Sequence, residues 1–338
     1  MLDNKTILIT GGTGSFGKSF TRLTLQNYNP KKIIIYSRDE MKQWVMNETF
    51  QHEDPQGKIQ YVIGDVRDKE RLSRVCNDVD VIIHAAATKI VPTAEYNPFE
   101  CIKTNIDGAK NVIEASFDNH VSKVVALSTD KACNPINLYG ATKLASDKLF
   151  CSANLMSGTK GPAFSVVRYG NVMGSRGSVI PFFQKKASTG SLPITDPKMT
   201  RFMITIKEAI HLVWHALEDA IGGEIYVHKI PSMNIMDIAE AISPGCEKNV
   251  IGIRPGEKIH EVMVSEEDAA STYEYDWYYK ILPTLNNWHL DKNRIKNGQK
   301  VAEGFIYSSG MNNDWMTKET LQQILQTDDY LELQAFNS

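Results

Sequence analysis

The sequence predicts an α/β protein with a doubly wound parallel sheet and a smaller, interleaved C-terminal lobe. Three observations support this prediction. Short apolar runs alternate with helical patterns in the first half of the 338-residue chain. These runs lack strict polar alternation, which is typical of strands buried on both faces. After residue 169 the pattern gives way to segments rich in Gly, Pro and Ser, which indicate loops.

The individual elements follow in chain order, and strand–helix alternation places the strands in right-handed βαβ units. Strands are expected at residues 6–10, 32–36, 59–63, 79–84, 123–128 and 163–169. Helices are expected at residues 15–25, 40–50, 69–77, 98–120 and 138–155. Farther along we expect a helix at 206–217, a strand at 224–228 returning to the main sheet, a helix at 232–242 and an irregular tail from 252, aromatic-rich at 273–279.

Composition and charge exclude several classes of protein. The net charge is −3, which gives no basic field for nucleic acid or an anionic membrane surface. No apolar run reaches the roughly 18 residues of a transmembrane helix, and residues 1–6 leave no room for a signal peptide. The five cysteines form no CxxC pair, so we expect free thiols, no metal site and a cytoplasmic location. For Cys133 a packing role is favoured over a reactive thiol.

A glycine-rich turn links the first predicted strand to the first helix. Gly11, Gly14 and Gly17 form G-x-x-G-x-x-G there. The first glycine permits a tight turn, the second lets a pyrophosphate approach the backbone, and the third allows close helix–strand packing. N–H groups at the helix N-terminus can bind the phosphates, as in Rossmann-like dinucleotide sites. The candidate contacts of the turn are Gly11, Thr13, Gly14, Ser15, Phe16 and Gly17.

The end of the second predicted strand bears on which dinucleotide binds. Ser37 and Arg38 precede Asp39, and a hydroxyl with a guanidinium suits the 2′-phosphate of NADP. Lys42 adds a second charge, whereas Asp39 keeps NAD open as the less favoured cofactor. An alternative role for Asp65 is that of a helix N-cap. The other candidate cofactor contacts are Asp65, Val66, Ala85, Ala86, Lys89, Leu127, Ser128 and Val172.

Tyr139 and Lys143 form Y-x-x-x-K on a predicted helix, which places both on one face. An ammonium near a phenol lowers the pKa of the tyrosine, which can then take a proton from a substrate hydroxyl as hydride leaves for nicotinamide. Ser128 and Thr129 close the preceding strand, where a hydroxyl can bond the same substrate oxygen. Together with the glycine turn, this pattern is typical of extended short-chain dehydrogenases/reductases.

Several long segments sharpen this resemblance. Residues 127–143, LSTDKACNPINLYGATK, resemble the nucleotide-sugar 4,6-dehydratases. Across nearly the whole chain the sequence is similar to the inverting UDP-N-acetylglucosamine 4,6-dehydratases, which open pseudaminic acid synthesis. The similar segments are HAAATK at 84–89, EYNPFECIKTNI at 95–106, VVRYGNVMGSRGSVIPFF at 166–183, IRPGEKIHEVM at 253–263 and GQKVAEGFIYSS at 298–309. Family members often have leucine at the position of Thr88, and retaining dehydratases typically carry Asp-Glu where this chain has Asp130-Lys131.

The resemblance implies roles for particular residues. Lys131 is implied to be the base that removes the C5 proton and Asp130 the acid for water loss, with Thr129, Tyr139 and Lys143 completing the catalytic set. Lys131 must then be neutral before abstraction. Burial and nearby cations lower its pKa and Asp130 raises it, and the sequence leaves open which effect prevails. The implied UDP-sugar contacts are Lys89, Asn171, Ser178, Val179, Thr195, Arg254 and Glu257.

The resemblance also implies an NADP-binding domain at residues 1–170 plus about 203–229, and a nucleotide-sugar-binding lobe at about 171–202 and 230–338. It implies a homo-oligomer, a dimer or a hexamer built from dimers, with the predicted helix at 98–120 as a candidate dimer face. Two other functions stay open. A UDP-sugar 4-epimerase would need Tyr139 and Lys143 but no acid and base for C5 and C6. A non-catalytic regulator would bind NADP without turnover.

Overall fold

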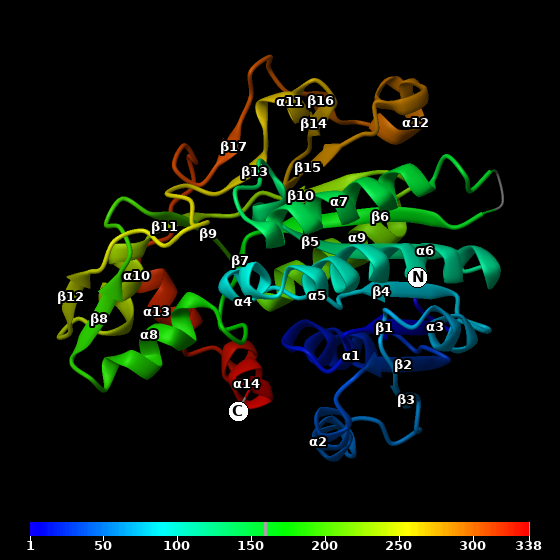
Figure 1. Cartoon of the computed structure of the whole chain (residues 1–338), viewed down its shortest axis with the longest axis horizontal. Coiled ribbons are helices and arrows are strands. Elements are labelled where there is room, and N and C mark those ends of the chain that lie inside the picture. Colours follow the sequence, from blue (N-terminus) through cyan, green and yellow to red (C-terminus); the bar gives the residue numbers. More distant parts are fainter. Residues whose placement is uncertain (159–160, 338) are drawn as a thin grey trace.

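The computed structural model of the protein describes residues 1–158 and 161–337. Its centre is a ten-stranded sheet in the order β16-β14-β15-β10-β6-β5-β4-β1-β2-β3, with helices on both faces (Figure 1). The strands from β10 to β3 in this order are parallel, which confirms the predicted Rossmann-like, doubly wound α/β class. The parallel strands are β1 (Thr6–Thr10), β2 (Lys32–Ser37), β3 (Ile59–Ile63), β4 (Val81–His84), β5 (Lys123–Thr129), β6 (Ala163–Tyr169) and β10 (Ile225–His228).

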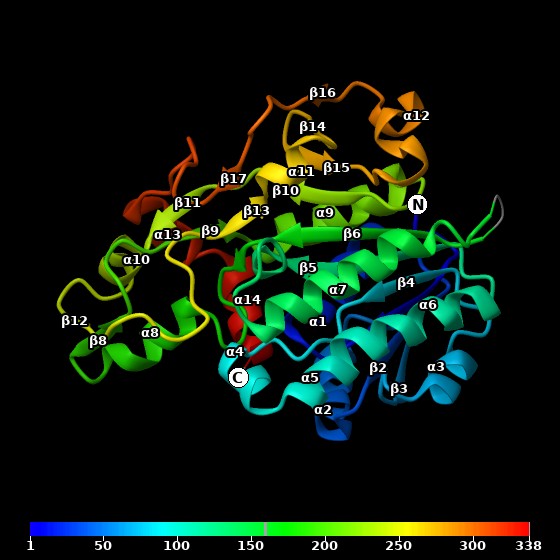
Figure 2. The same ribbon diagram turned by 45° about the horizontal axis from the view of Figure 1, so that its top comes forward.

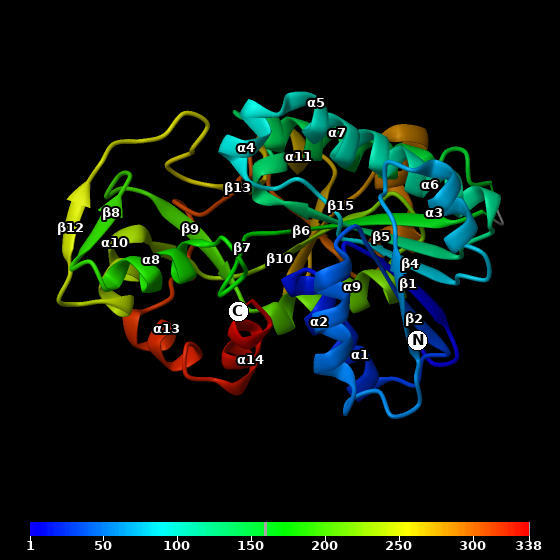
Figure 3. The same ribbon diagram turned by 60° about the horizontal axis from the view of Figure 1, so that its bottom comes forward.

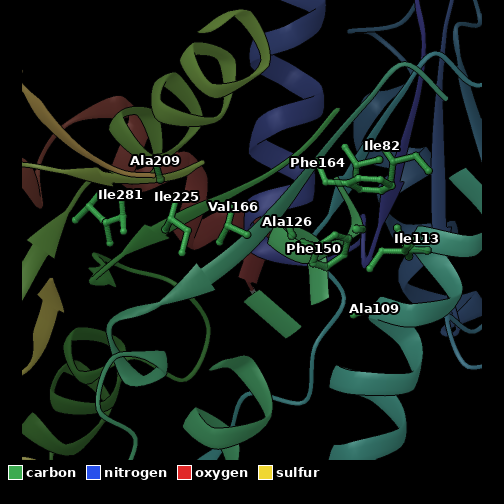
Figure 4. Close-up of a cluster of buried hydrophobic side chains, with 14 of the residues drawn as sticks. Ile82, Ala109, Ile113, Ala126, Phe150, Phe164, Val166, Ala209, Ile225 and Ile281 are labelled. Atoms are coloured by element: carbon green, nitrogen blue, oxygen red, sulfur yellow. The ribbon is translucent and has the colours of Figure 1, made fainter. Parts of the chain in front are cut away.

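Both faces of the sheet are apolar, which explains why the strands read as continuous apolar runs. Alternate residues of β1 join different clusters: Leu8 faces one core, and Ile7 and Ile9 face the other. The first core lies under α3 (Lys69–Val75), α6 (Gly108–Asp118) and α7 (Leu138–Ala153), and Figure 4 shows part of it around Ile82, Phe150 and Phe164. The second lies under α1 (Ser15–Asn27), α2 (Glu40–Phe50), α9 (Ile206–Asp219) and α14 (Asp328–Asn337) (Figure 3).

The predicted helix at 98–120 is wrong as a single α-helix. The structure has α5 (Pro98–Ile102), a π-helical turn η1 (Lys103–Asp107) and then α6, preceded by the unpredicted α4 (Val91–Tyr96). In the π turn, Asn105 accepts from Thr88 N at 2.8 Å and donates to Thr88 O at 3.0 Å. The wide turn therefore ties this segment to the loop after β4, a long-range contact that periodicity does not encode. Since Thr88 uses only its backbone in these bonds, its departure from leucine leaves the tie intact.

The segments after residue 169 build a second lobe at one side of the main sheet (Figure 2). It contains a three-stranded sheet of β7 (Asn171–Val172), β9 (Thr200–Ile204) and β11 (Ser232–Asn234), and a pair of β8 (Ser191–Ile194) and β12 (Glu247–Val250). Helices α8 (Val179–Ala187), α10 (Ile235–Ile242) and α13 (Lys318–Ile324) pack around a separate apolar core. The predicted helix at 232–242 therefore begins only after a short strand.

The predicted irregular tail is wrong, because strands β14 (Thr272–Glu274), β15 (Tyr278–Ile281) and β16 (Gln299–Lys300) extend the main sheet beyond β10. They run antiparallel to their neighbours. Tyr275 and Tyr278 stack with ring centroids 4.4 Å apart, so the aromatic-rich segment packs against this edge. The predicted second-lobe segment 230–338 thus contributes to both sheets. Strands of two to four residues are too short for a period of two to be recognised.

The remaining short elements are η2 (Asp130–Ala132), α11 (Glu266–Ala269), η3 (Leu285–Leu290), α12 (Lys292–Ile295), β13 (Val262–Val264) and β17 (Tyr307–Ser308). Asp268 of α11 meets the buried Arg168 of β6 at 3.4 Å. Within the described ranges, every helix is too short or too polar to cross a membrane.

Candidate active site

The candidate residues gather at the carboxyl edge of the parallel strands. The strand order reverses between β1, β2 and β3 on one side and β4, β5 and β6 on the other, and open α/β sheets bind ligands at such a switch point. The loops after β1, β4 and β5 lie at this edge, and the loop between β12 and β13 contacts the segment after β5 from the second lobe. Asn137 Nδ2 donates to Gly256 O at 2.8 Å, and Lys258 Nζ donates to Cys133 O at 2.6 Å.

The glycine turn after β1 has the geometry of a phosphate cradle. Gly11 has a positive φ of 68°, and a Cβ there would lie 2.8 Å from the backbone of Ala86. A Cβ at Gly17 would lie 2.3 Å from Gly12 O. Gly14 is the N-cap of α1, and no side chain in the described part of the chain caps this end. The first-turn N–H groups of the helix therefore face a space that suits an anion.

Charged side chains stand at the end of β2. The Arg38 side chain is 60% exposed and its Nη1 lies 3.6 Å from Asp65 Oδ2, while Lys42 is 49% exposed and pairs with Asp39 at 2.9 Å. Asp39 also caps α2 by accepting from Lys42 N. The carbonyl and hydroxyl of Ser37 both accept from Gln43 Nε2 at 3.1 Å, which leaves the hydroxyl hydrogen available to a ligand. The two exposed cations are the groups best placed to meet a phosphate.

Asp65 is not a helix cap, because α3 is capped by Asp68, whose side chain accepts from Arg71 N at 2.9 Å. Instead Asp65 accepts from the Arg67 guanidinium, and its neighbour Val66 is buried with its carbonyl bonded to Asn111.

Tyr139 and Lys143 are both buried near the start of α7, with exposures of 8% and 3%. The helix is fixed at its N-terminus by Asn137, which accepts from Gly140 N, and by Glu95 of α4, which accepts from Leu138 N at 2.7 Å. Burial raises the pKa of Tyr139 to about 12, although Lys131 and a hydrogen bond with Thr129 oppose this. The predicted lowering by Lys143 is therefore wrong for this state of the site, since burial prevails. Burial also lowers the pKa of Lys143 itself.

Asp130 and Lys131 occupy the 3-10 turn η2 directly after β5. Lys131 Nζ lies 3.0 Å from Asp130 Oδ1 and 3.2 Å from Glu261 Oε1, and the two acidic side chains are only 1% and 2% exposed. Burial lowers the pKa of Lys131, but the charges of Asp130 and Glu261 outweigh it and raise the pKa well above its ordinary value. Of the two opposing effects that the sequence leaves open, the charges of the two carboxylates therefore outweigh burial at Lys131.

Behind this turn, Ser128 bonds to a buried carboxylate. Its hydroxyl donates to Asp147 Oδ2 at 2.7 Å, and Asp147 also meets Arg168 at 3.5 Å. Thr129, on the opposite side of β5, donates to Asp130 Oδ1 at 2.9 Å. Of the two hydroxyls, Thr129 is therefore the one beside the candidate catalytic groups. Cys133 is buried, which raises the pKa of its thiol to about 11, so the packing role is the one its surroundings favour.

Several residues predicted to contact the UDP-sugar lie in the second lobe. Ser178 is the N-cap of α8, whose first residue is Val179, and its buried hydroxyl has no hydrogen-bond partner among the described residues. A helix N-terminus with a spare hydroxyl suits a phosphate. Arg254 is 48% exposed and lies 3.7 Å from Glu257.

Other predicted contacts have structural partners. The Thr195 hydroxyl donates to Met199 Sδ at 2.9 Å. Asn171 and Val172 form β7, Leu127 is half-buried in β5, Ala85 N donates to Thr10 O, and Lys89 is exposed after β4.

Sequence reasoning missed the charged residues that surround the predicted pair. Glu261 contacts Lys131 from just before β13, and Arg201 of β9 lies 3.9 Å from Glu261. Glu261 stands inside the IRPGEKIHEVM segment, so an acidic residue in a long similar segment was the available clue. The spacing of residues in the sequence does not indicate that Glu261 contacts Lys131, which lies 130 positions earlier in the chain. Across the described ranges, no group of three or more His, Cys, Asp or Glu side chains is arranged to hold a metal.

Comparison with known proteins gives the site its context. Residues 7–283 match the model of a family described as polysaccharide biosynthesis protein. The chain belongs to this family. A UDP-N-acetylglucosamine 4,6-dehydratase (inverting) of Campylobacter jejuni is 55% identical over 332 residues, which cover 96% of this chain and 98% of that protein. A UDP-glucose 4-epimerase of Rickettsia typhi is 39% identical over 347 residues and covers 100% of both chains.

Solved structures agree with the fold of this family. The structure of Pen from Bacillus thuringiensis has a TM-score of 0.87 and 35% identity, and it covers 96% of this chain and 98% of its own. A dTDP-glucose 4,6-dehydratase of Streptomyces venezuelae, DesIV, solved with NAD and TYD bound, has a TM-score of 0.67 at 22% identity over 75% of this chain and 86% of its own. At that identity the second likeness supports the doubly wound α/β fold alone.

Proposed function

We propose that this protein is an NADP-dependent hydro-lyase that converts UDP-N-acetylglucosamine into UDP-2-acetamido-2,6-dideoxy-β-L-arabino-hex-4-ulose, with inversion at C5. The similarity to the inverting dehydratase of Campylobacter jejuni supports the substrate and the reaction. The observation that carries the proposal is the contact of Lys131 with Asp130 at 3.0 Å beside the buried Tyr139. A 4-epimerase needs only the tyrosine and lysine, whereas water loss needs an additional acid and base.

Tyr139 is the group proposed to take the proton of the C4 hydroxyl. A bound oxidised nicotinamide supplies a hydride acceptor at C4 and a hydride donor at C6. The resulting 4-keto group acidifies the C5 proton, which Lys131 removes while Asp130 donates a proton to the departing C6 hydroxyl. Thr129 holds Asp130, and its bond with Tyr139 keeps these groups in one cluster.

The protons of the Asp130–Lys131 pair balance over the reaction. The two side chains lie 3.0 Å apart, and their resting form is proposed to be an ammonium and a carboxylate. Transfer of one proton from Nζ to Oδ1 gives a neutral amine and a carboxylic acid, which are the base and the acid that elimination needs. When the amine takes the C5 proton and the acid protonates the leaving hydroxyl, the pair returns to its resting charges. No proton has to enter from solvent before water is lost.

The choice of NADP rests on the exposed cations at the end of β2. Arg38 and Lys42 can both reach a 2′-phosphate, while the glycine turn and the open end of α1 fit the pyrophosphate. Ser178, Arg254 and Glu257 are proposed to hold the UDP moiety from the second lobe. As further parts of the proposal, we expect a cytoplasmic homo-oligomer that performs the first step of pseudaminic acid synthesis. Its candidate dimer face includes the exposed Phe99 of α5.

The direct test is incubation with UDP-N-acetylglucosamine and NADP in heavy water, followed by mass spectrometry and NMR. The expected product has lost one water and carries solvent deuterium at C5. The Rickettsia relatives make a 4-epimerase the second candidate, and a product of unchanged mass would favour it. Cofactor binding without turnover on any UDP-sugar would instead support the regulatory alternative.

A further inference from the structure

Glu261 is a buried carboxylate that neither strand pairing nor the cofactor requires. Its side chain is 2% exposed, and it contacts the same Lys131 Nζ atom as Asp130 does. Its backbone N–H donates to the Ser309 hydroxyl at 2.9 Å, and that hydroxyl meets Thr200 Oγ1 at 2.7 Å, so the position of Glu261 is fixed by two segments of the second lobe. A buried carboxylate without a partner would cost several kcal/mol, on the order of a charge desolvation penalty, so its partner defines its role.

That partner is Lys131. The Nζ atom lies 3.2 Å from Glu261 Oε1 and 3.0 Å from Asp130 Oδ1. The second oxygen of each carboxylate, Oε2 of Glu261 and Oδ2 of Asp130, is buried without a hydrogen-bond partner among the described residues. The carboxylates of Asp130 and Glu261 therefore both contact the single Lys131 side chain. Of the two, only Asp130 directly follows Thr129 and lies near Tyr139.

We propose that Glu261 is a positioning residue that acts through Lys131, holding Nζ opposite Asp130 and supplying the fixed negative charge that stabilises the ammonium formed when Lys131 takes the C5 proton. No bond to the substrate is required of Glu261. The part of this inference that concerns turnover rests on the proposed function, while the part that concerns the charge of Lys131 does not.

Other charged groups also face the pair and have to be considered with it. Arg201 of β9 lies 3.9 Å from Glu261 Oε1, and its charge opposes that of Lys131. Tyr139 approaches from α7, and His260, which precedes Glu261, turns its ring to the Thr200 hydroxyl at 2.8 Å. Only the carboxylates favour the ammonium. Loss of the negative charge at 261 therefore lowers the pKa of Lys131, whereas loss of a neighbouring cation would raise it.

The first experiment reads the charge of Lys131 without turnover. Acetic anhydride acetylates only neutral amines, and peptide mass spectrometry at about pH 9, below the ordinary lysine pKa, quantifies the acetylation of each lysine. We expect Glu261→Gln to raise acetylation of Lys131 at least tenfold, because an opposite charge at this distance shifts a pKa by about one to three units. Glu261→Asp should stay near the parental rate. Equal acetylation of Lys131 in the parent and the Gln variant would overturn the proposal.

Two references make this measurement interpretable. Glu266→Gln removes an exposed carboxylate five residues later and should leave Lys131 unchanged. If Glu261→Gln does not fold, the pH dependence of the parental protein still tests the charge. Acetylation of Lys131 should keep rising to about pH 11, beyond the ordinary lysine pKa of about 10.4. Levelling of Lys131 at or below that ordinary value would contradict the proposal.

The second experiment uses turnover. In Glu261→Gln, the alkaline limb of the kcat profile should move to lower pH by about one unit or more, with KM for UDP-N-acetylglucosamine nearly unchanged. Glu261→Asp should restore the limb. An unmoved limb, or one shifted to higher pH, would overturn the inference. If the parental protein itself gives no dehydrated product, the proposed function fails, and the acetylation result still decides the role of Glu261.

Discussion

The two ends of the candidate site hold charge in opposite ways. At the proposed adenosine end, Arg38 and Lys42 are 60% and 49% exposed, and the glycine turn contributes backbone N–H groups. At the proposed catalytic end, Asp130 and Glu261 are 1% and 2% exposed and both contact Lys131. Exposed charges are screened by water and salt, whereas buried charges set one another's protonation. Substitutions at the first end should therefore change cofactor affinity, and those at the second should change chemistry.

The largest effect is expected at the buried end. Tyr139→Phe removes the proposed acceptor of the C4 proton and should lower kcat by about 10²–10⁴-fold, the usual contribution of a general base. NADP affinity, measured by fluorescence titration, should change little. Tyr96→Phe, at a tyrosine that is 86% exposed on α4, serves as the matched control. Turnover by Tyr139→Phe at the parental rate would show that the buried phenol of Tyr139 has no catalytic role.

A second prediction extends the effect of burial to stability. Burial, assisted by the charge of Lys143, lowers the pKa of His84 to about 3. The unfolded chain binds this proton near pH 6.5, so the contribution is fully present above that pH and is lost as the pH falls toward 3, at about 1.4 kcal/mol per pH unit. Between pH 7 and 5, urea unfolding should show the parent losing about 2 kcal/mol more than His84→Asn. If the parent and His84→Asn lose the same free energy of unfolding over this range, His84 is not the titrating group.

The smallest effect is expected at the exposed end. Arg38→Ala should weaken NADP binding about tenfold to a hundredfold, as for a charged hydrogen bond, and leave NAD binding within about twofold. The proposed preference of the parent for NADP should also shrink as salt is added, because both cations are open to solvent. Lys31→Ala, at an exposed position just before β2, is the control. Equal losses for both dinucleotides would place the 2′-phosphate elsewhere.

The same contrast explains how much the sequence could predict. The strands at 6–10 and 163–169 appear as β1 and β6 with the predicted bounds, because buried parallel strands carry their own apolar signature. The strand at 59–63 also appears with the predicted bounds, as the edge strand β3, although none of its residues is buried. The glycine turn and the Asp130-Lys131 pair are also local in sequence. The pairing of Lys131 with Glu261 and the edge strands β14 to β16 depend on chain segments far apart, so neither spacing nor periodicity contains them.

The directions of the Lys131 and Tyr139 pKa shifts also depend on chain segments far apart in the sequence. The residue types alone indicate which groups raise each pKa and which lower it, but distances and exclusion from water decide which effect is larger. The Y-x-x-x-K spacing suggests that Lys143 lowers the pKa of Tyr139. The groups that oppose the effect of burial on this pKa are instead Lys131, in the turn after β5, and Thr129, at the end of β5.

The most direct test of the separate roles proposed for Tyr139 and Lys131 is a single-turnover experiment on Lys131→Ala with NADP and UDP-N-acetylglucosamine. Lys207→Ala serves as the exposed control. Absorbance follows reduced nicotinamide, and mass spectrometry follows loss of water. The account predicts that Lys131→Ala forms reduced cofactor through Tyr139 but yields no product lighter by one water, while Lys207→Ala behaves as the parent. Water loss by Lys131→Ala at the parental rate would contradict it.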